Sequence, residues 1–369
     1  MRWKFRKRAL LVLGIVALAI LPGPAQTYTE SKKITRSFPA QPDTRLDLSN
    51  KYGRVHLIPW KKDSVKIVVD LYVRSSSSKK LERTMNNIDL EFTGTKYYII
   101  ASTHFGSTSN VFFSDLRDLS ESIIPSKNQV EIDYTVMVPS SMDINVSNKF
   151  GDIFIDDLKG NVSVSLSNGD LKINRLEGES SINHHFGKGI INYINNGKLT
   201  LSYSNLEIGE GKQLNVTSKS SEIYIDKVDI LKIESRRDKY LAGQMNNLFG
   251  NSYFSDISVG SMHDEVNFSP GYGDFRIDSV SAGFSYINLN SDYSDIRMVF
   301  SKTSSFYLDI DYHPDVILRI PDDMGDFERT NLDKDRIRLS GMAGRSESSK
   351  RVEISAPRKC IISLSIRND

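Results

Sequence analysis

The segment Asn148-Lys149-Phe150-Gly151-Asp152-Ile153-Phe154-Ile155 joins a polar turn to a short strand. In the strand, Ile153 and Ile155 share one face and Phe154 lies on the other. Related segments recur along the chain: Ser49-Asn50-Lys51-Tyr52-Gly53, Asn168-Gly169-Asp170-Leu171-Lys172-Ile173, Tyr272-Gly273-Asp274-Phe275-Arg276-Ile277 and Tyr293-Ser294-Asp295-Ile296-Arg297-Met298. The turn and its strand are therefore a repeated unit.

The repeats follow one another at steps of mostly roughly 17 or 18 residues, which is typical of repeat folds whose units stack on their neighbours. The first inward residue of the second strand in each coil is expected at these positions: Ile153, Leu171, Ile190, Leu206, Ile223, Tyr240, Ile257, Phe275 and Ile296. The register is ambiguous around 186–194 and in the poor copy around 235–250. The pattern predicts an all-β fold, a stacked-coil β-solenoid (β-helix) with a β-rich N-terminal capping region that carries one short helix.

Four segments are expected along the chain. They are a signal peptide at 1–25, an N-terminal β-rich region at 26–140 with a helix near 79–88 and a loop insertion at 104–128, a repeat β-solenoid at 141–300, and C-terminal coils with a cap at 301–369. The two end regions are expected to cover sheet edges that would otherwise pair with other chains.

The first residues predict export. Five basic residues precede an apolar run from Ala9 to Leu21, and Gly23-Pro24-Ala25 follows with small residues. A run of about a dozen apolar residues is short for a membrane span and typical of a cleaved signal peptide, although a retained N-terminal anchor stays open. Removing these five basic residues changes the net charge from +2 to −3. We therefore expect no nucleic-acid partner and no stable transmembrane span after cleavage.

Cysteine usage adds a constraint on stability. Cys360 is the single cysteine, so an intrachain disulfide is impossible. Alternation places it on the buried face of a last strand with Ile362 and Leu364. The fold must therefore be stabilised by its core, and the chain is long enough to build a large one.

The motifs resemble those of the "putative adhesin" family of bacterial cell-envelope proteins, which are secreted β-solenoid domains of largely unknown function. The residues that carry the resemblance are Val138-Pro139, Asn145 to Ile153, Leu158 to Val164, Ser167 to Leu171 and Ser49 to Val55. The copies at Ser218 to Glu222 and Ser235 to Lys239 lack the Gly and depart from the pattern. The resemblance implies an exported protein, in the periplasm, at the outer membrane or on the cell surface. It transfers no catalytic residue.

Polar columns offer candidate chemistry, but each has a simpler explanation. One column precedes the second strands and comprises Asp152, Asp170, Gly189, Asn205, Glu222, Lys239, Asp256, Asp274 and Asp295. It could bind cations or carbohydrate, yet its interruptions favour ordinary turn chemistry. His184-His185 occupies a turn, and the other four histidines share no ligand spacing with it. We predict no catalytic residue, no metal site and no cofactor.

Outward strand positions are the remaining candidates for binding. The candidate surface-binding residues on the outer sheet faces are Phe154, Lys172, Tyr224, Arg276 and Arg297. A mixed, regular surface suits contact with a polymer or a protein, and exposed aromatic rings can stack on sugars. We expect a non-enzymatic adhesin or scaffold whose partner is an envelope or matrix polysaccharide or another envelope protein. A polysaccharide-acting hydrolase or lyase, and an envelope-stress or signalling accessory protein, are the alternatives.

Overall fold

A computed structural model describes residues 27–106 and 129–367. The predicted signal peptide and most of the predicted loop insertion lie outside these residues. Over the described residues the fold is all-β with one α-helix, as predicted, and the strands form one large mixed sheet that is not closed. No helix within the described ranges is long and apolar enough to cross a membrane.

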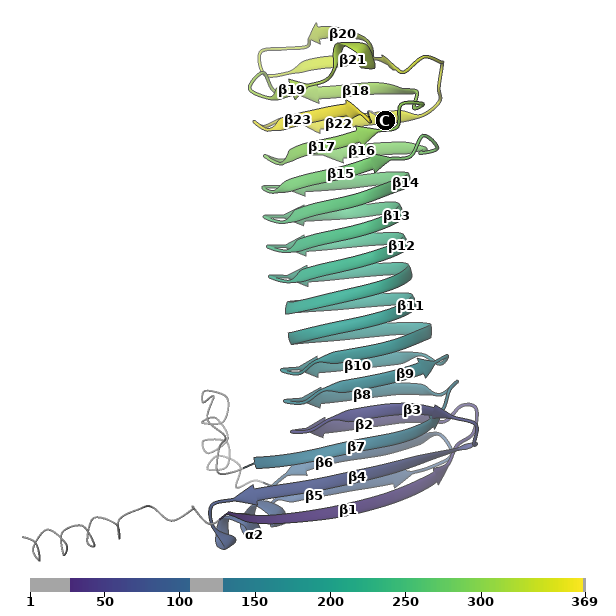
Figure 1. Cartoon of the computed structure of the whole chain (residues 1–369), viewed down its shortest axis with the longest axis vertical. Helices are drawn as coiled ribbons and strands as arrows, with labels where there is room; N and C mark the ends of the chain where they lie inside the picture. The colour runs from purple at the N-terminus through teal and green to yellow at the C-terminus, as the bar shows by residue number, and fades with distance from the viewer. Residues whose placement is uncertain (1–26, 107–128, 368–369) are drawn as a thin grey trace, which may run out of the picture. The chain divides into compact units, whose positions relative to one another are not determined.

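The longest strands lie in the middle of the chain (Figure 1). Those before the middle are β1 (Tyr28–Pro39), β2 (Arg45–Lys51), β3 (Val55–Trp60), β4 (Ser64–Ser75), β5 (Ile88–Gly94), β6 (Tyr98–Phe105), β7 (Gln129–Pro139), β8 (Asp143–Lys149), β9 (Ile153–Leu158) and β10 (Val162–Ser167). The middle strands are β11 (Leu171–Lys219), β12 (Glu222–Arg236), β13 (Lys239–Tyr253) and β14 (Asp256–Gly271). The last are β15 (Asp274–Val280), β16 (Tyr286–Asn290), β17 (Asp295–Phe300), β18 (Phe306–Tyr312), β19 (Ile317–Arg319), β20 (Gly325–Asn331), β21 (Ile337–Ala343), β22 (Arg351–Ala356) and β23 (Ile361–Ile366).

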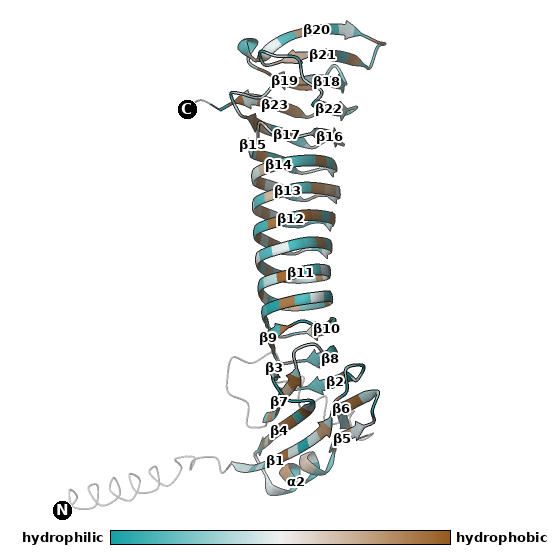
Figure 2. Cartoon of the chain, turned by 90° about the vertical axis from the view of Figure 1, so that its right-hand side faces the viewer, coloured by the Kyte–Doolittle hydropathy of each residue, from teal (hydrophilic) through white to brown (hydrophobic). Residues whose placement is uncertain are grey.

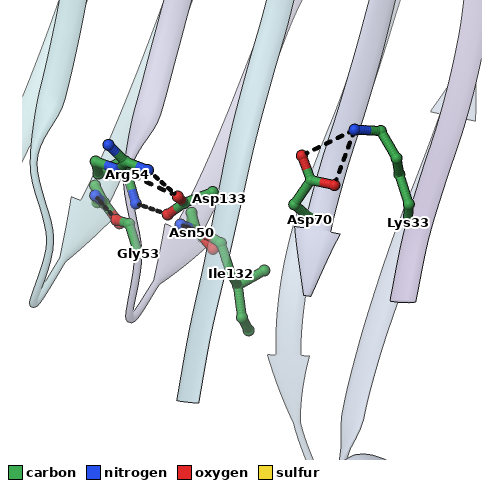
Figure 3. A network of polar contacts seen from close by, with 8 residues as sticks. Lys33, Asn50, Gly53, Arg54, Asp70, Ile132 and Asp133 are labelled. Atoms are coloured by element: carbon green, nitrogen blue, oxygen red, sulfur yellow. Dashed lines mark hydrogen bonds and ion pairs between the residues drawn. The ribbon is translucent and has the colours of Figure 1, made fainter. Parts of the chain in front are cut away.

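The chain divides into two compact units. Of the described residues, the first unit comprises 27–33, 70–89, 104–106 and 129–131, and the second comprises 34–69, 90–103 and 132–367. The first unit contains the helix α2 (Ser78–Asn86), which starts where the Ser77 hydroxyl accepts a hydrogen bond from the Lys80 backbone N–H at 3.2 Å. Leu81 is its buried residue. In the same unit, Lys33 forms an ion pair with Asp70 at 3.1 Å (Figure 3).

In the second unit, strands pair in parallel with the strand one step later in the chain. Asn205 of β11 pairs with Glu222 of β12, which pairs with Lys239 of β13, which pairs with Asp256 of β14. Each step is 17 residues long, and we call one such step a winding. The alternation of side chains is in phase between paired strands, so inward residues contact inward residues. Hydrophobic and hydrophilic residues alternate along these strands (Figure 2).

The inward residues form a continuous apolar core. Ile223 and Ile257 are 2% exposed, and Tyr240, in the poor copy of the repeat, is 1% exposed. Cys360 is buried just before β23, as predicted, and desolvation raises the pKa of its thiol to about 11. The thiol is therefore an inert part of the core.

The prediction that Ile190 faces inward is wrong. Ile190 is 43% exposed, whereas its neighbours Gly189 and Ile191 are buried. A Cβ added at Gly189 would lie 2.6 Å from Cδ1 of Leu206, so the missing side chain makes room for the leucine of the next winding. Hydrophobicity favours the isoleucine as the inward residue, but packing against Leu206 selects the glycine.

The ends of the second unit do not follow chain order. β2 lies between β6 and β8, and β3 lies between β7 and β9. At the C-terminal end β22 lies between β16 and β18, and β23 lies between β17 and β19. β21 pairs with β18 and β20 in antiparallel fashion. At the N-terminal end early strands thus lie between later ones, and at the C-terminal end late strands lie between earlier ones.

Candidate functional site

The five predicted surface residues lie on one outward column of the second unit, but they do not form one cluster. Phe154 and Lys172 are neighbours on β9 and β11, and Arg276 and Arg297 are neighbours on β15 and β17. Tyr224 of β12 lies apart from both pairs. The column therefore has an aromatic and basic pair, a lone tyrosine and an arginine pair.

Apolar side chains also belong to this outward column. Tyr224 is 45% exposed, and its neighbour Leu241 on β13 is 40% exposed. Ile190, predicted to be inward, is exposed as well. Leu241 and Ile190 were missed because alternation alone does not say which face of a strand is turned toward solvent.

Arg276 and Arg297 line a depression of about 460 Å³ with Arg319. Asp274 and Asp295 line the same depression, and Arg276 forms an ion pair with Asp278. Carboxylates thus offset much of the positive charge of this arginine group.

A second exposed surface runs along the turn that precedes these strands. We call it the corner column, and it consists of residues with φ between 51° and 64°: Tyr52, Phe150, Asn168, Phe186, Tyr203, Ser220, Arg237, Phe254, Tyr272 and Tyr293. Residues other than Gly are uncommon in this left-handed region, because their Cβ crowds the backbone. Most members are nevertheless aromatic, so the rings must gain contacts that offset this cost.

The rings of the corner column stack on one another in groups. Tyr52 lies 5.5 Å from Phe150, and Phe186 lies 5.1 Å from Tyr203, with near-parallel planes in both pairs. A third group contains Phe254, Tyr272, Tyr293 and the adjoining Tyr253, with ring centroids 4.5–5.2 Å apart. Such contacts stabilise a turn by about 0.5–1.5 kcal/mol each.

The same rings remain open to solvent. Six of them are 38–52% exposed: Phe150, Phe186, Tyr203, Phe254, Tyr272 and Tyr293. Stacking covers their faces and leaves their outer edges accessible. The sequence carries a signal for this surface, since an aromatic residue precedes Gly in several copies of the repeated motif.

Buried polar side chains hold the corner from inside. Asn50 donates to the carbonyl of Ile132 at 2.9 Å, and Arg54 pairs with Asp133 beside it (Figure 3). Asn148 donates to the carbonyl of Gly53 at 2.8 Å. His184 takes the equivalent place two windings later, and its Nε2 donates to the carbonyl of Gly169 at 2.9 Å.

The His184-His185 pair is therefore split between inside and outside. His184 is fully buried, and burial lowers its pKa. Its Nδ1 has no hydrogen-bond partner within the described part of the chain. Those residues also contain no group of three or more His, Cys, Asp or Glu side chains that could hold a metal ion.

Where the Gly of the motif is lost, a side chain replaces it. Ser221, Asp238 and Ser255 follow the corner residues of successive windings. The Asp238 carboxylate accepts the backbone N–H of Ser221 at 2.7 Å, and the Ser255 hydroxyl accepts that of Asp238 at 3.0 Å. The copies that depart from the sequence motif thus close the same corner by another route.

The acidic column has a structural role in the backbone. Asp152 accepts the N–H of Asp170 at 2.8 Å, and Asp170 accepts that of Lys188 at 2.9 Å. Lys188, and not the predicted Gly189, is the member of the column at this level. The same bond joins Asp256 to Asp274 at 3.1 Å. Each carboxylate therefore ties one winding to the next.

The carboxylates also influence one another. The pKa of Asp274 is raised by desolvation and by the neighbouring charges of Asp256 and Asp295. Asp295 accepts the backbone N–H of Ile361 at 2.8 Å.

Comparisons with known proteins find weak likenesses only. No family model and no curated protein matches the chain. Among solved structures, a "putative cell adhesion protein" from Clostridium sporogenes is 10% identical, with 91% of this chain and 100% of that chain covered and a TM-score of 0.21. A "putative lipid binding protein" from Parabacteroides distasonis is 12% identical, with coverages of 92% and 97% and a TM-score of 0.28. A "putative adhesin" from Bacteroides fragilis is 11% identical, with coverages of 91% and 97% and a TM-score of 0.21.

Proposed function

We propose that this chain is a secreted, non-enzymatic β-solenoid of the bacterial cell envelope, which serves as an adhesin or scaffold. Its partner would be an envelope or matrix polysaccharide or another envelope protein. The observation that carries the proposal is the corner column, in which six exposed aromatic rings lie in groups along successive repeats.

The solenoid part of the proposal is supported by the register of the second unit. Parallel pairing with steps of 17 residues continues from β11 to β14. The step from β8 to β10, and from β10 to β11, is 18 residues. A stack of this kind repeats side chains about 4.8 Å apart. Similar groups are thus presented to a partner at regular intervals.

The exposed rings support a contact role. Aromatic side chains are enriched where proteins bind partners, because they bury a large area and lose little conformational freedom. Lys51 adds a cation beside two of the rings, 4.7 Å from the centroid of Tyr52 and 5.8 Å from that of Phe150. Burial and the nearby charge of Lys149 lower the pKa of Lys51. An anionic group on the partner would relieve this repulsion.

The role of the aspartates supports a protein without hydrolase chemistry. General acid–base cleavage of a glycoside needs two carboxylates that face the scissile bond. Oxygens of Asp152, Asp170 and Asp256 instead accept backbone N–H groups of the next winding. Export to the envelope rests on the predicted signal peptide at 1–25.

A pull-down from native envelopes tests this proposal. The bait is the full mature chain, and the variant is Phe254→Ser with Tyr272→Ser and Tyr293→Ser. Serine is a suitable replacement because Ser220 occupies the same corner with φ 51°. The control is Leu332→Ser, which removes a side chain of similar exposure, 44%, outside the corner column.

We expect the triple variant to lose the captured partner and the control to keep it. Capture that is unchanged in the triple variant would contradict a role for the corner column. Incubation of the protein with envelope polysaccharides is run in parallel, and shortening of any polymer would support the enzyme alternative.

A further inference from the structure

We propose that a groove in the second unit, separate from the corner column and lined by both polar and apolar side chains, binds an extended, uncharged polysaccharide. The groove is open to solvent, has a volume of about 1060 Å³ and crosses β2, β8, β10, β11 and β12. The inference rests on the proposed function in one respect, since it takes the partner to be a polymer.

The floor of the groove is made by small outward side chains. Ser163 of β10 pairs with Asn145 of β8 on one side and with Ser181 of β11 on the other. Both serines are half-buried. Longer side chains flank them, with Asp47 beyond Asn145 and with Lys198, Asn215 and Lys232 in the later windings. The short side chains between longer ones leave a depression in this face of the sheet.

The wall of the groove offers hydrogen bonds that the protein itself does not use. Within the described residues, no hydrogen bond is made by the side chains of Asn196, Gln213 or Asn215, which line the groove. Amides both donate and accept, so they match hydroxyl groups, which do the same. By contrast, Asn145 donates to Asp47 at 3.3 Å, and Asn161 accepts the N–H of Glu179 at 3.0 Å. Free and occupied amides thus lie at opposite ends of the groove.

The charges of the groove balance. Its cations are Arg45, Lys198 and Lys232, and its anions are Asp47, Asp143 and Glu179. Arg45 and Asp47 neutralise each other at 3.2 Å. A polyanion would meet Asp143 and Glu179, and a polycation would meet the lysines. An uncharged, hydroxyl-rich chain avoids both penalties.

The dimensions favour a polymer over a small sugar. From β2 to the end of β12 the groove spans roughly 30 Å, because neighbouring strands lie about 4.8 Å apart. Each winding adds a polar group at this interval, which is comparable to the length of one sugar residue in an extended chain. The polymer would therefore lie along the stack, across the strands.

Affinity electrophoresis of the full mature chain tests the inference. Gels contain one of three uncharged polymers (hydroxyethyl cellulose, dextran or galactomannan) or the polyanion polygalacturonate. The first variant, Ser163→Tyr with Ser181→Tyr, fills the floor with residues that suit strands. The second replaces Asn196, Gln213 and Asn215 by Ala. The control is Ser258→Tyr, the same change at a half-buried outward position of β14 outside the groove.

We expect at least one uncharged polymer to retard the wild type, with little change between low and high salt. Both groove variants should bind at least about tenfold more weakly, since they lose space or hydrogen bonds, while Ser258→Tyr binds like the wild type. Thermal unfolding midpoints of all variants should match, which separates binding from misfolding.

Three results would overturn the inference: no retardation by any uncharged polymer, unchanged binding by the filled variant, or a preference for polygalacturonate that salt abolishes. Failure here is distinguishable from failure of the proposed function. If the filled variant still captures its envelope partner while the corner variant loses it, the adhesin proposal stands and the groove does not.

Discussion

At the scale of single residues, the corner of each winding is closed by whichever buried polar group is present. Asn148 donates to the carbonyl of Gly53 and His184 to that of Gly169, each in a neighbouring winding. They are not equivalent, because Nε2 of His184 carries the hydrogen in this bond and its buried Nδ1 has no partner among the described residues. Protonation of Nδ1 would bury a positive charge, and the nearby charge of Asp170 offsets only part of the desolvation cost.

This difference predicts a pH-dependent stability. Burial lowers the pKa of His184 in the folded protein below its value of about 6.5 in the unfolded chain, so the unfolded chain binds more protons. Stability should be complete above this value and fall as the pH drops below it, by at most about 1.4 kcal/mol per pH unit. His184→Asn should flatten the dependence of the thermal midpoint between pH 7 and pH 5. His185→Asn is the control, and equal slopes in both variants would contradict the assignment.

A second residue-scale prediction concerns a buried carboxylate. Asp238 is 5% exposed and accepts four hydrogen bonds, from the N–H groups of Ser221 and Arg236 and the hydroxyls of Ser218 and Ser235. Asp238→Ala would leave these donors buried without partners, which costs about 1–3 kcal/mol for each unsatisfied group. We expect a loss of about 3 kcal/mol or more in the free energy of unfolding, measured by urea titration. Asp238→Asn keeps two acceptor lone pairs and should lose less.

At the scale of the elements, the close approach of successive turns explains the glycines of the motif. A Cβ at Gly169 would lie 2.2 Å from the carbonyl oxygen of Gly151, and one at Gly187 would lie 2.0 Å from that of Gly169. The turns stack so closely that only a missing side chain, or a Ser or Asp that caps the neighbouring amide, fits there.

Gly169→Ala should therefore force two windings apart and lower the free energy of unfolding by about 1–3 kcal/mol, as overpacking does. Gly283→Ala is a matched control, because its nearest neighbour, Oγ of Ser281, would lie 3.7 Å from the new Cβ. This control should change stability by less than about 0.5 kcal/mol. Similar losses for both variants would show that the stacked turns tolerate a methyl group.

At the scale of the whole molecule, the proposed solenoid predicts that the chain tolerates the loss of one whole winding. If each winding contacts only its neighbours, one complete winding is dispensable. Deleting residues 222–238 would place Asn205 beside Lys239, which is the present partner of Glu222. We expect this variant to keep its β-type circular dichroism spectrum and to unfold cooperatively, at a slightly lower temperature.

Deletion of residues 222–230 removes about half a winding and is the comparison. It would place the buried Leu231 at the exposed position of Glu222, beside Asn205, so the inward side chains of the following strand would face solvent. We expect an unfolded or aggregated product. A folded product from this shorter deletion would argue against in-register stacking.

The sequence by itself determined the all-β fold and most of the buried residues. Alternation in strands such as Ile153-Phe154-Ile155 is a local property, and it is enforced wherever one face is covered. The buried Tyr240 and Cys360 follow from the same rule, even in poor copies of the repeat. A tight turn with Gly is equally local.

Only the tertiary structure decided that Ile190 faces outward and Gly189 inward, how Ser221 and Asp238 replace a glycine, and where the groove lies. Each of these depends on a residue about one winding away, such as Leu206 beneath Gly189. The late insertion of β22 and β23 between earlier strands is likewise set by pairing across more than sixty positions of the chain. Contacts between windings, which leave little trace in local sequence, therefore place the groove and the exposed rings.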